Sequence, residues 1–462
     1  MPCKGQQDTS SGGRGHSPKE PRRGLAAFSP PGWGCPNTSA AGSGPASFPP
    51  SVTFWLFLSQ VLDEKGSCRE ALRRFQAWLS LERGKTASPN TAAYCKARAK
   101  LRPQELRRVN QRIVDRMETA FPWRWHGRRV QVVDGTGLSM PDTPENQAAW
   151  PQPKRAKKGC GFPVMRVAAL FSLATGAMTG FAHGALAVHE RTLYRKLWRL
   201  LKRGDVLLGD RGFCAFADFY LLSRNGVDCV MRKNGRRKNA SVIRRNSKND
   251  RIVEWKRSGA RPKWLAPKTW RDLPESIAVR EVEVHVQFPG FRSQVILVAT
   301  TLLDHRVFPA SDISDLYLKR WRVELFFRDL KTTMGMDILR CQAPPMVGNE
   351  LWMHVIAYNL VRAVMSEAAL AHAVPHDRIS FKGTVSTLRQ WAPALATRGP
   401  LRKQRLALYS WMLACIAKDT LPFRPGRNEP RARKRRPKAY QLLNKPRAQF
   451  REIMHRNRYK KP

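Results

Sequence analysis

Hydrophobic periodicity divides the chain into a helical part followed by an alternating part. Between residues 51 and 122, apolar positions recur at helical spacing, most clearly from Cys68 to Leu81 and in the basic amphipathic segment from Arg102 to Phe121. Ser88 and Pro89 are residue types that begin helices. An all-α module is therefore predicted over residues 51–122. Residues 1–50 are rich in Pro, Gly and Ser without apolar period, and are expected to be a disordered or spurious extension.

Beyond residue 122 the apolar period changes to two, which is typical of strands. Strands are predicted at Arg129 to Asp134, Val164 to Leu173, Met178 to Ala185, Val206 to Asp210 and Val227 to Met231, with helices at His189 to Lys202 and Ala215 to Arg224. Hairpin strands followed by alternating helix and strand predict an α/β core with a mixed sheet, whose first part spans residues 123–232.

Residues 233–305 interrupt this order and are predicted to be a mainly β insertion. Alternating apolar positions at Val282, Val284, Val286 and Phe288 lead to a Pro289-Gly290 turn and a second strand from Val295 to Val298. The same segment contains Trp255, Trp264 and Trp270. These rings either stack on a flipped base or pack inside the insertion, and packing is the favoured interpretation.

The core is expected to resume over residues 306–340 with a helix from Asp312 to Thr333. Residues 341–420 are predicted to be helical, near Asn349 to Ala371 and Arg402 to Ala417, and residues 421–462 form a basic tail.

Charge then narrows the class of partner. Lys and Arg number 83 against 35 Asp and Glu, a formal charge of +48. A charge this large favours a polyanion as partner, nucleic acid before an anionic membrane surface. The longest uncharged apolar run, Val52 to Leu62, is too short to span a bilayer, so no membrane partner is expected. The nine scattered cysteines without a C-x-x-C pair indicate reduced thiols in the cytosol.

Two aspartates follow predicted strands. Asp134 ends Val-Gln-Val-Val and precedes Gly135, and Asp210 ends a second apolar strand and precedes Arg211-Gly212. Ligands bind at the carboxyl ends of strands in open sheets, and glycine there allows close approach to the backbone. The alternative is that each aspartate only caps the turn or helix that follows.

A third carboxylate lies on the predicted helix from Ser311 to Thr333. A helical wheel places one acid among hydroxyl and cationic groups on a stripe opposite the apolar face: Tyr317, Arg320, Glu324, Arg328 and Lys331. The alternative is a solvated face with weak i,i+4 pairs. Three carboxylates from two strand ends and a helix can hold two Mg²⁺ ions for phosphoryl transfer, with the cationic stripe on a DNA phosphate.

These residues carry a resemblance to a known family. The pattern Tyr317-x2-Arg320-x3-Glu324-x6-Lys331 matches the Y-R-E-K signature of bacterial insertion-sequence transposases of the DDE class. The blocks around Asp134 and Asp210 and the run from Glu429 to Lys438 also match, so the resemblance covers about residues 52 to 440.

The resemblance implies both a fold and a site. The fold class is α/β: a ribonuclease-H-like mixed sheet flanked by helices and interrupted by the β insertion, with the all-α N-terminal module and a helical, basic C-terminal region. Asp134, Asp210 and Glu324 would form the metal-binding catalytic triad, with two Mg²⁺ ions for which Mn²⁺ is an alternative. Tyr317, Arg320 and Lys331 would hold phosphates of the transposon end. Trp321 would lie beside the DNA end, with a buried tryptophan as the alternative.

The implied activity is Mg²⁺-dependent cleavage at transposon ends and strand transfer into target DNA. The expected partners are terminal inverted repeats, a target duplex and a second copy of the chain, and the expected location is the nucleoid in the bacterial cytoplasm. A nuclease without strand transfer and an inactive DNA-binding relative are the alternatives.

Secondary DNA contacts are expected from a basic run, the N-terminal module and the tail. The run comprises Lys154, Arg155, Lys157 and Lys158, for which a solvated loop is the alternative, and Arg211 and Arg328 are further candidates. The module at residues 51–122 is predicted to bind the terminal repeats. The tail residues Arg431 to Lys438 are predicted to clamp DNA without sequence preference.

Overall fold

The computed structural model describes residues 48–63, 66–84, 86–155, 157, 159–235, 240–286, 294–396, 402–422 and 449. Lys158, the Pro289-Gly290 turn with Phe288, most of the predicted N-terminal extension and the Arg431 to Lys438 run lie outside the described residues. The helices are α1 (Pro50–Leu62), α2 (Cys68–Arg83), α3 (Ala92–Ala99), α4 (Pro103–Ala120), α5 (Pro144–Ala149), α6 (Glu190–Arg195), α7 (Phe216–Arg224), α8 (Pro267–Arg271), α9 (Ala310–Leu318), α10 (Arg322–Arg328), α11 (Pro344–Ala371), α12 (Phe381–Ala396) and α13 (Arg402–Lys418).

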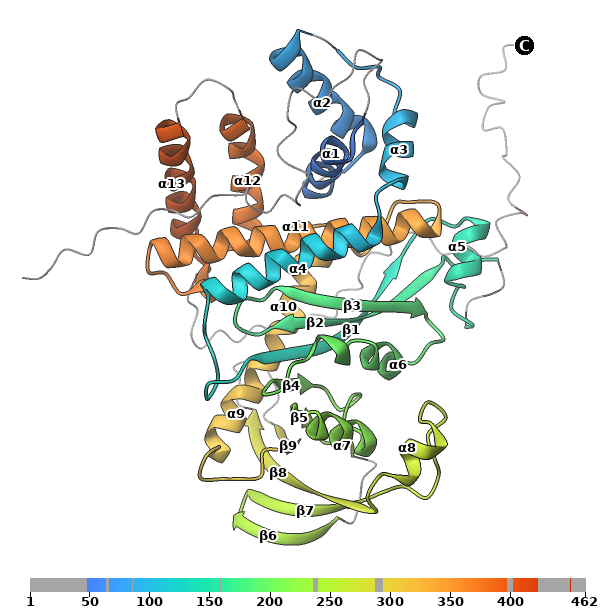
Figure 1. The fold of residues 1–462 in the computed structure, drawn as a ribbon, viewed down its shortest axis with the longest axis vertical. Coiled ribbons are helices and arrows are strands. Elements are labelled where there is room, and N and C mark those ends of the chain that lie inside the picture. Colours follow the sequence, from blue (N-terminus) through green and yellow to red (C-terminus); the bar gives the residue numbers. More distant parts are fainter. Residues whose placement is uncertain are drawn as a thin grey trace, which may run out of the picture.

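One mixed sheet forms the centre of the described chain (Figure 1). Its strands are β1 (Val130–Ser139), β2 (Val164–Ser172), β3 (Met178–Ala185), β4 (Val206–Gly209), β5 (Asp228–Arg232), β6 (Ser241–Ser247), β7 (Asp250–Lys256), β8 (Ser276–Val286) and β9 (Gln294–Thr300), in the order β3-β2-β1-β4-β5-β9-β8-β7-β6. The first three strands pair antiparallel, and β1, β4 and β5 pair parallel. This is the ribonuclease-H-like sheet that the predicted fold class requires, and that fold class is confirmed.

Helices cover both faces of the sheet because successive strand residues point to opposite sides. Val132 belongs to the core shared with α4, α9, α10 and α11, whereas its neighbour Val133 belongs to the core shared with α6 and α7. In Figure 1, α4 and α11 lie together over β2 and β3, with α6 and α7 on the other side. Strand β4 and most of β2 are therefore nearly continuous buried runs, as expected where a sheet is buried on both faces.

The insertion extends the sheet, because β9 pairs antiparallel with β5. Its Arg280 side chain is fully buried and donates to the Asp250 carboxylate at 2.8 and 2.7 Å and to the Phe308 carbonyl at 2.7 Å. Phe308 comes just before α9, so Arg280, which Asp250 holds within the insertion, links the insertion by its hydrogen bond to the start of the helical segment that carries Glu324.

Several predicted elements differ from the observed ones. Strand β1 continues to Ser139, because Gly135 to Ser139 pair with β2 and do not form a turn. The single helix predicted from His189 to Lys202 is α6 followed by a 3₁₀ turn at Trp198–Leu200. The pattern did not indicate β6, β7, α8 or α12, because β6 is exposed along nearly its whole length and α12 contains Pro393.

The three tryptophans of the insertion lie in different environments. Trp255 is buried and packs against Phe219 of the core, with ring centroids 5.2 Å apart. Trp270 is half-buried beneath the Arg257 guanidinium. Trp264 is more exposed and lies 3.6 Å beneath the Arg195 guanidinium. Packing therefore accounts for Trp255 and Trp270, as favoured from the sequence.

Candidate active site

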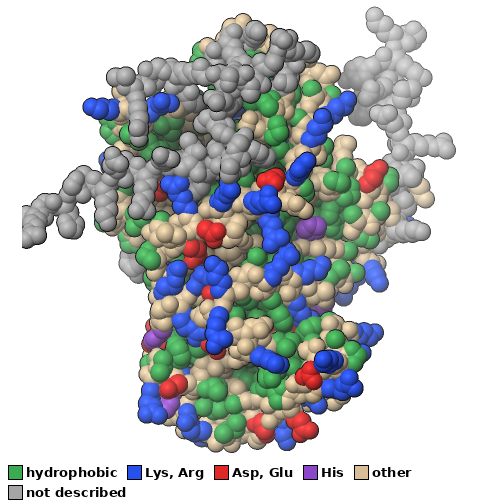
Figure 2. Space-filling view, in the orientation of Figure 1, with side chains coloured by type: hydrophobic (Ala, Val, Ile, Leu, Met, Phe, Trp, Pro, Cys, Tyr) green, Lys and Arg blue, Asp and Glu red, His purple; other side chains and the backbone are tan. Residues whose placement is uncertain are grey.

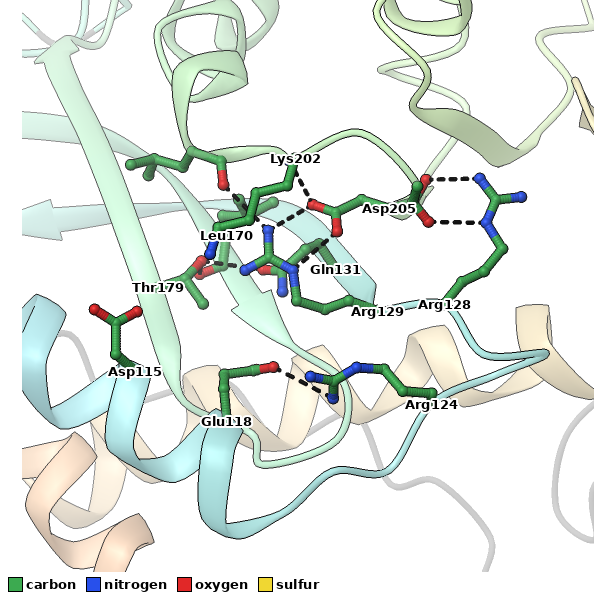
Figure 3. Close-up of polar contacts among 12 residues, drawn as sticks. Asp115, Glu118, Arg124, Arg128, Arg129, Gln131, Leu170, Thr179, Lys202 and Asp205 are labelled. Carbon is green, nitrogen blue, oxygen red and sulfur yellow. Dashed lines mark hydrogen bonds and ion pairs between the residues drawn. The ribbon is translucent and has the colours of Figure 1, made fainter.

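The amino ends of β1 and β4 are held together by a buried ion pair. Arg129 donates to both carboxylate oxygens of Asp205, at 2.9 and 2.5 Å, and the Lys202 backbone N–H donates to the same carboxylate (Figure 3). This contact lies directly before the register Val130↔Val206 of the two parallel strands. The Arg129–Asp205 ion pair therefore fixes the register in which the two parallel strands begin.

That register brings the two predicted aspartates to equivalent positions. Asp134 and Asp210 are separated along the chain by the same offset as the paired residues Val132 and Leu208. Adjacent parallel strands lie about 4.8 Å apart, and both aspartates share the strand face of Val132 and Leu208. Helix α10 packs against β1 from this face. Asp134 therefore lies in the middle of β1 and not at its end as predicted, and Asp210 follows β4 directly, both on the sheet face against which the helix of Glu324 packs.

The segment that carries Glu324 is wound differently from the regular helix predicted. After α9 it tightens into a 3₁₀ turn at Lys319–Trp321, continues as α10 and widens into a π-helix at Asp329–Thr333. These changes rotate side chains away from the positions of a regular wheel. The prediction of one stripe opposite the apolar face is wrong for Tyr317 and Arg320, which are buried, whereas Glu324 and Arg328 are exposed.

Tyr317 and Arg320 lie inside the site. Burial, opposed by the Arg320 guanidinium and reinforced by the Asp210 carboxylate, raises the pKa of Tyr317 to about 12. The Tyr317 hydroxyl therefore keeps its proton and remains a hydrogen-bond donor at neutral pH. The nearest approach of Arg320 Nη2 to Glu324 Oε1 is 4.0 Å, with the Glu324 side chain 64% exposed. Trp321 is half-buried and stands edge-on to the Tyr317 ring, which matches neither a fully buried nor a free aromatic.

Lys331 is tied to the strand that carries Asp134. Its Nζ donates to Thr136 Oγ1 and to the Gly137 carbonyl, both at 3.2 Å. The π-helix thus brings the last residue of the four-residue signature next to the first aspartate. The remaining cationic candidates lie at the surface: Arg328, Arg211, Lys154, Arg155 and Lys157 are all exposed.

Electrostatics link the three predicted carboxylates. Burial raises the pKa of Asp134, and the carboxylates of Asp210 and Glu324 raise it further, while the Gly135 backbone N–H and Arg320 act in the opposite direction. The Gly135 N–H donates to Asp134 Oδ1 at 2.8 Å. Residues from two strands and a helix, far apart in the sequence, therefore lie within electrostatic reach of one another.

A fourth carboxylate lies at the same place and was missed from the sequence. Glu190 is the first residue of α6, and burial together with Asp134 raises the pKa of its carboxyl group. A Cβ atom added to Gly135 would lie 1.3 Å from Glu190 Oε1. A signal was available, because Glu190 is the only acid between Glu145 and Asp205 in a strongly basic segment.

The donor set fits a hard divalent cation. Asp134, Asp210, Glu324 and Glu190 offer only carboxylate oxygens, and Gly135 has no side chain to keep Glu190 away from this group. Within the described ranges, no group of three or more His, Cys, Asp or Glu side chains is already arranged to hold a metal ion. Binding would therefore require the side chains to turn inward, which the exposed Glu324 is free to do.

Replacing Asp134 by asparagine is expected to stabilise the protein at neutral pH in EDTA. Its folded-state pKa is raised, so the protonated carboxyl is favoured by folding and stability is lost as pH rises through that pKa. Asparagine removes the charge, and a gain of about 0.5–2 kcal/mol in the free energy of unfolding is expected at pH 7. Urea titrations of both proteins should show the gain shrinking below the ordinary pKa of 3.8. A less stable variant at pH 7 would contradict the assignment of buried charge.

The chain is similar in sequence to known transposases. A family model described as "Transposase DDE domain" matches residues 125–360, which include Asp134, Asp210 and Glu324. The chain is 27% identical over 401 residues to transposase InsG of insertion sequence element IS4 from Escherichia coli strain K12, covering 85% of this chain and 86% of that protein. A solved structure, piggyBac transposase in a synaptic complex with hairpin DNA, gives a TM-score of 0.39 at 10% identity over 80% of this chain and 78% of that chain.

Among the described residues, no helix combines the length and apolarity that crossing a bilayer requires. The cysteines among them are free thiols: Cys68, Cys95, Cys160, Cys214, Cys229, Cys341 and Cys415.

Proposed function

Because the chain belongs to the transposase DDE-domain family, we propose that it cuts DNA at the ends of a bacterial insertion sequence and joins the freed 3′-hydroxyls to target DNA. Asp134, Asp210 and Glu324 would hold Mg²⁺, for which Mn²⁺ is an alternative. The observation that supports the proposal is the parallel register of β1 and β4, which puts Asp134 and Asp210 at equivalent positions on the sheet face against which α10, the helix of Glu324, packs.

Each group of the site has a part in phosphoryl transfer. Divalent ions bound there would activate a water or 3′-hydroxyl and stabilise the leaving oxygen. Tyr317 keeps its proton and can donate to a phosphate oxygen, and Arg320 offers a charge-assisted donor beside Glu324. These two side chains are held by burial, so they are oriented before DNA binds.

The DNA path proposed outside the site follows exposed cations. Figure 2 shows Lys and Arg side chains in a band over α3 and α4. The exposed cations on these two helices and at the junction between them are Lys96, Lys100, Arg102, Arg107, Arg108 and Arg112. They support the proposal that the N-terminal helical module binds the terminal repeats, with Lys154, Arg155, Lys157, Lys158, Arg211, Arg328 and Trp321 as further contacts. Phosphate contacts of this kind position DNA without specifying its sequence.

The proposal includes a homodimer on paired ends, since two ends must be cut and joined together. Because its substrate is chromosomal DNA, the protein would act at the nucleoid in the bacterial cytoplasm. The domain division proposed from the sequence assigns repeat binding to residues 51–122, chemistry to 123–232 and 306–340, and support to the insertion at 233–305. The region at 341–420 and the tail at 421–462 complete it.

One reaction tests the proposed function. The full chain is incubated with a linear fragment that carries the inverted repeats flanking its gene, with Mg²⁺ or with EDTA. Metal-dependent nicks at the repeat ends together with joined products are expected. Cuts without joining would indicate a nuclease, and a shifted band without cuts would indicate an inactive binder; either result contradicts the proposal.

Replacing Lys331 by alanine is expected to weaken binding to the ends. Loss of one phosphate contact should make the plot of log binding constant against log salt shallower by about 0.9. Titrations of a labelled end at several salt concentrations measure this slope. Lys331→Arg keeps the charge and should keep the slope, and an unchanged slope for Lys331→Ala would show that Lys331 serves only the contacts to Thr136 and Gly137.

A further inference from the structure

We infer that Glu190 is a fourth carboxylate of the metal site, which binds the divalent ion from the α6 side of the sheet. The inference rests on the proposed function and adds a residue to it. It is carried by the position of the Glu190 carboxylate against Gly135.

Gly135 gives Glu190 access to the site. Along β1, residue 135 shares the strand face of Val133, which packs with α6, whereas Asp134 faces α10. Glu190 therefore comes from the opposite face to Glu324. A Cβ at position 135 would lie 1.3 Å from Glu190 Oε1 and 2.4 Å from its carboxyl carbon, so this carboxylate occupies the space that any other residue would fill.

Gly137 shows that this arrangement is local. It points to the same face of β1 two residues further on, and an added Cβ there would meet nothing closer than Val164 Cγ1 at 3.8 Å. The close approach of a side chain is thus confined to the glycine that follows Asp134.

The position of Glu190 is fixed by the start of its helix. His189 is the N-cap of α6, and its ring accepts from the Arg191 backbone N–H at 3.2 Å. The Glu190 carboxylate interacts electrostatically with Asp134 and Asp210, and Arg166 is the cation that opposes them. Arg166 itself donates to the Val188 carbonyl at 2.8 Å.

The negative charge of these carboxylates favours binding of a cation. Among the described residues, no Lys, Arg or His side chain forms an ion pair with the Glu190 carboxylate, and Arg166 is the one cation that acts on it from a greater distance. Clustered carboxylates without paired cations repel one another, and a divalent ion removes that repulsion. Glu190 would thus supply a carboxylate oxygen to a divalent ion bound at this site.

Metal binding by the full chain tests the inference directly. Mn²⁺ is titrated into wild type and variants and followed by electron paramagnetic resonance, without DNA cleavage as a readout. Glu190→Gln, which keeps the side-chain volume, is expected to weaken Mn²⁺ binding about tenfold or more. Glu145→Gln is the matched control: Glu145 is likewise an acid in the first turn of a six-residue helix, and its removal should leave Mn²⁺ affinity unchanged.

A second variant tests the same inference by displacing the Glu190 carboxylate without replacing Glu190 itself. Gly135→Ala should displace the Glu190 side chain and weaken Mn²⁺ binding to a similar extent, whereas Gly137→Ala should not. The double variant Gly135→Ala/Glu190→Gln should bind no more weakly than the weaker single variant, because both changes remove the same ligand.

The outcomes separate the two proposals. If wild type binds Mn²⁺ and Asp134→Asn abolishes binding while Glu190→Gln and Gly135→Ala leave it unchanged, the inference about Glu190 is overturned and the proposed function stands. If wild type shows no Mn²⁺ binding that depends on Asp134, the metal site itself is overturned and both proposals fail.

Discussion

Replacing Glu324 by glutamine is expected to lower the rate of DNA cleavage about a thousandfold or more while leaving binding to the ends nearly unchanged. Glutamine has the same shape but no charge, so it is a poor ligand for a hard cation. A thousandfold loss is at the upper end of what removal of one electrostatic stabiliser of a transition state costs, about 4 kcal/mol.

Exposure explains why binding and cleavage should separate. The Glu324 side chain is 64% exposed, and its nearest cation is Arg320 at 4.0 Å, so no buried ion pair is broken by the change. The fold and the basic surface should therefore be retained. Removing an acid near the DNA also removes a repulsion from phosphate, which makes a loss of binding still less expected.

The measurement is single-turnover cleavage of an end fragment in Mg²⁺, beside a binding titration of the same fragment in EDTA. Asp315→Asn is the matched control, because Asp315 is an exposed acid on α9 that precedes the signature. It should cut at the wild-type rate. Cleavage by Glu324→Gln at a normal rate would show that this carboxylate is not part of the site.

Replacing Asp250 by asparagine is expected to lower the free energy of unfolding by about 3–5 kcal/mol. Its partner Arg280 is fully buried and meets both oxygens of the Asp250 carboxylate, at 2.8 and 2.7 Å. An asparagine presents an N–H₂ donor to one guanidinium donor and leaves the Arg280 charge buried without a counter-ion. Breaking a buried pair from one side costs this much, whereas replacing both partners by apolar residues is often neutral.

Urea titration measures the change, and the chain offers two controls. Asp272→Asn alters an exposed acid at the end of α8 in the same insertion and should change stability by less than about 0.5 kcal/mol. The double variant Asp250→Leu/Arg280→Met should recover most of the loss. If Asp250→Asn costs less than about 1 kcal/mol, the buried Asp250–Arg280 ion pair does not stabilise the fold to the expected extent.

Local patterns predicted most of the strands and singled out three carboxylates as candidate metal ligands. Strand β3 begins and ends where the alternation does, at Met178 and Ala185. Period-two and helical spacing record which side chains are buried, and burial in this sheet follows residue by residue from the backbone. Asp134 and Asp210 stood out because an acid after an apolar strand is unusual in so basic a chain. Their roles in chemistry remain predictions.

Features that depend on non-local pairing could not be read in this way. Gly135 to Ser139 look like a turn by composition, yet they remain in β1 because β2 supplies hydrogen-bonding partners from another part of the chain. Tyr317 is buried because α9 packs it into the main core, and Arg320 is buried in the 3₁₀ turn that follows, where the winding departs from a regular helix. A helical wheel, which assumes a constant angle per residue, cannot show such a change in winding or the packing of α9.

By itself, the sequence determined the strong positive charge, the alternation of helix and strand, and the order of the acids along the chain. These properties are local, since each follows from residue type and spacing. Only the tertiary structure decided that Asp134 and Asp210 lie at equivalent positions of two parallel strands, whose register begins at the Arg129–Asp205 ion pair. It also decided that the Glu190 carboxylate lies against Gly135, next to Asp134 in the chain. The physical reason is that the distance between side chains from different elements depends on how those elements pack. A glycine in the sequence shows that a side chain is absent, but it does not show which neighbouring residue fills the space.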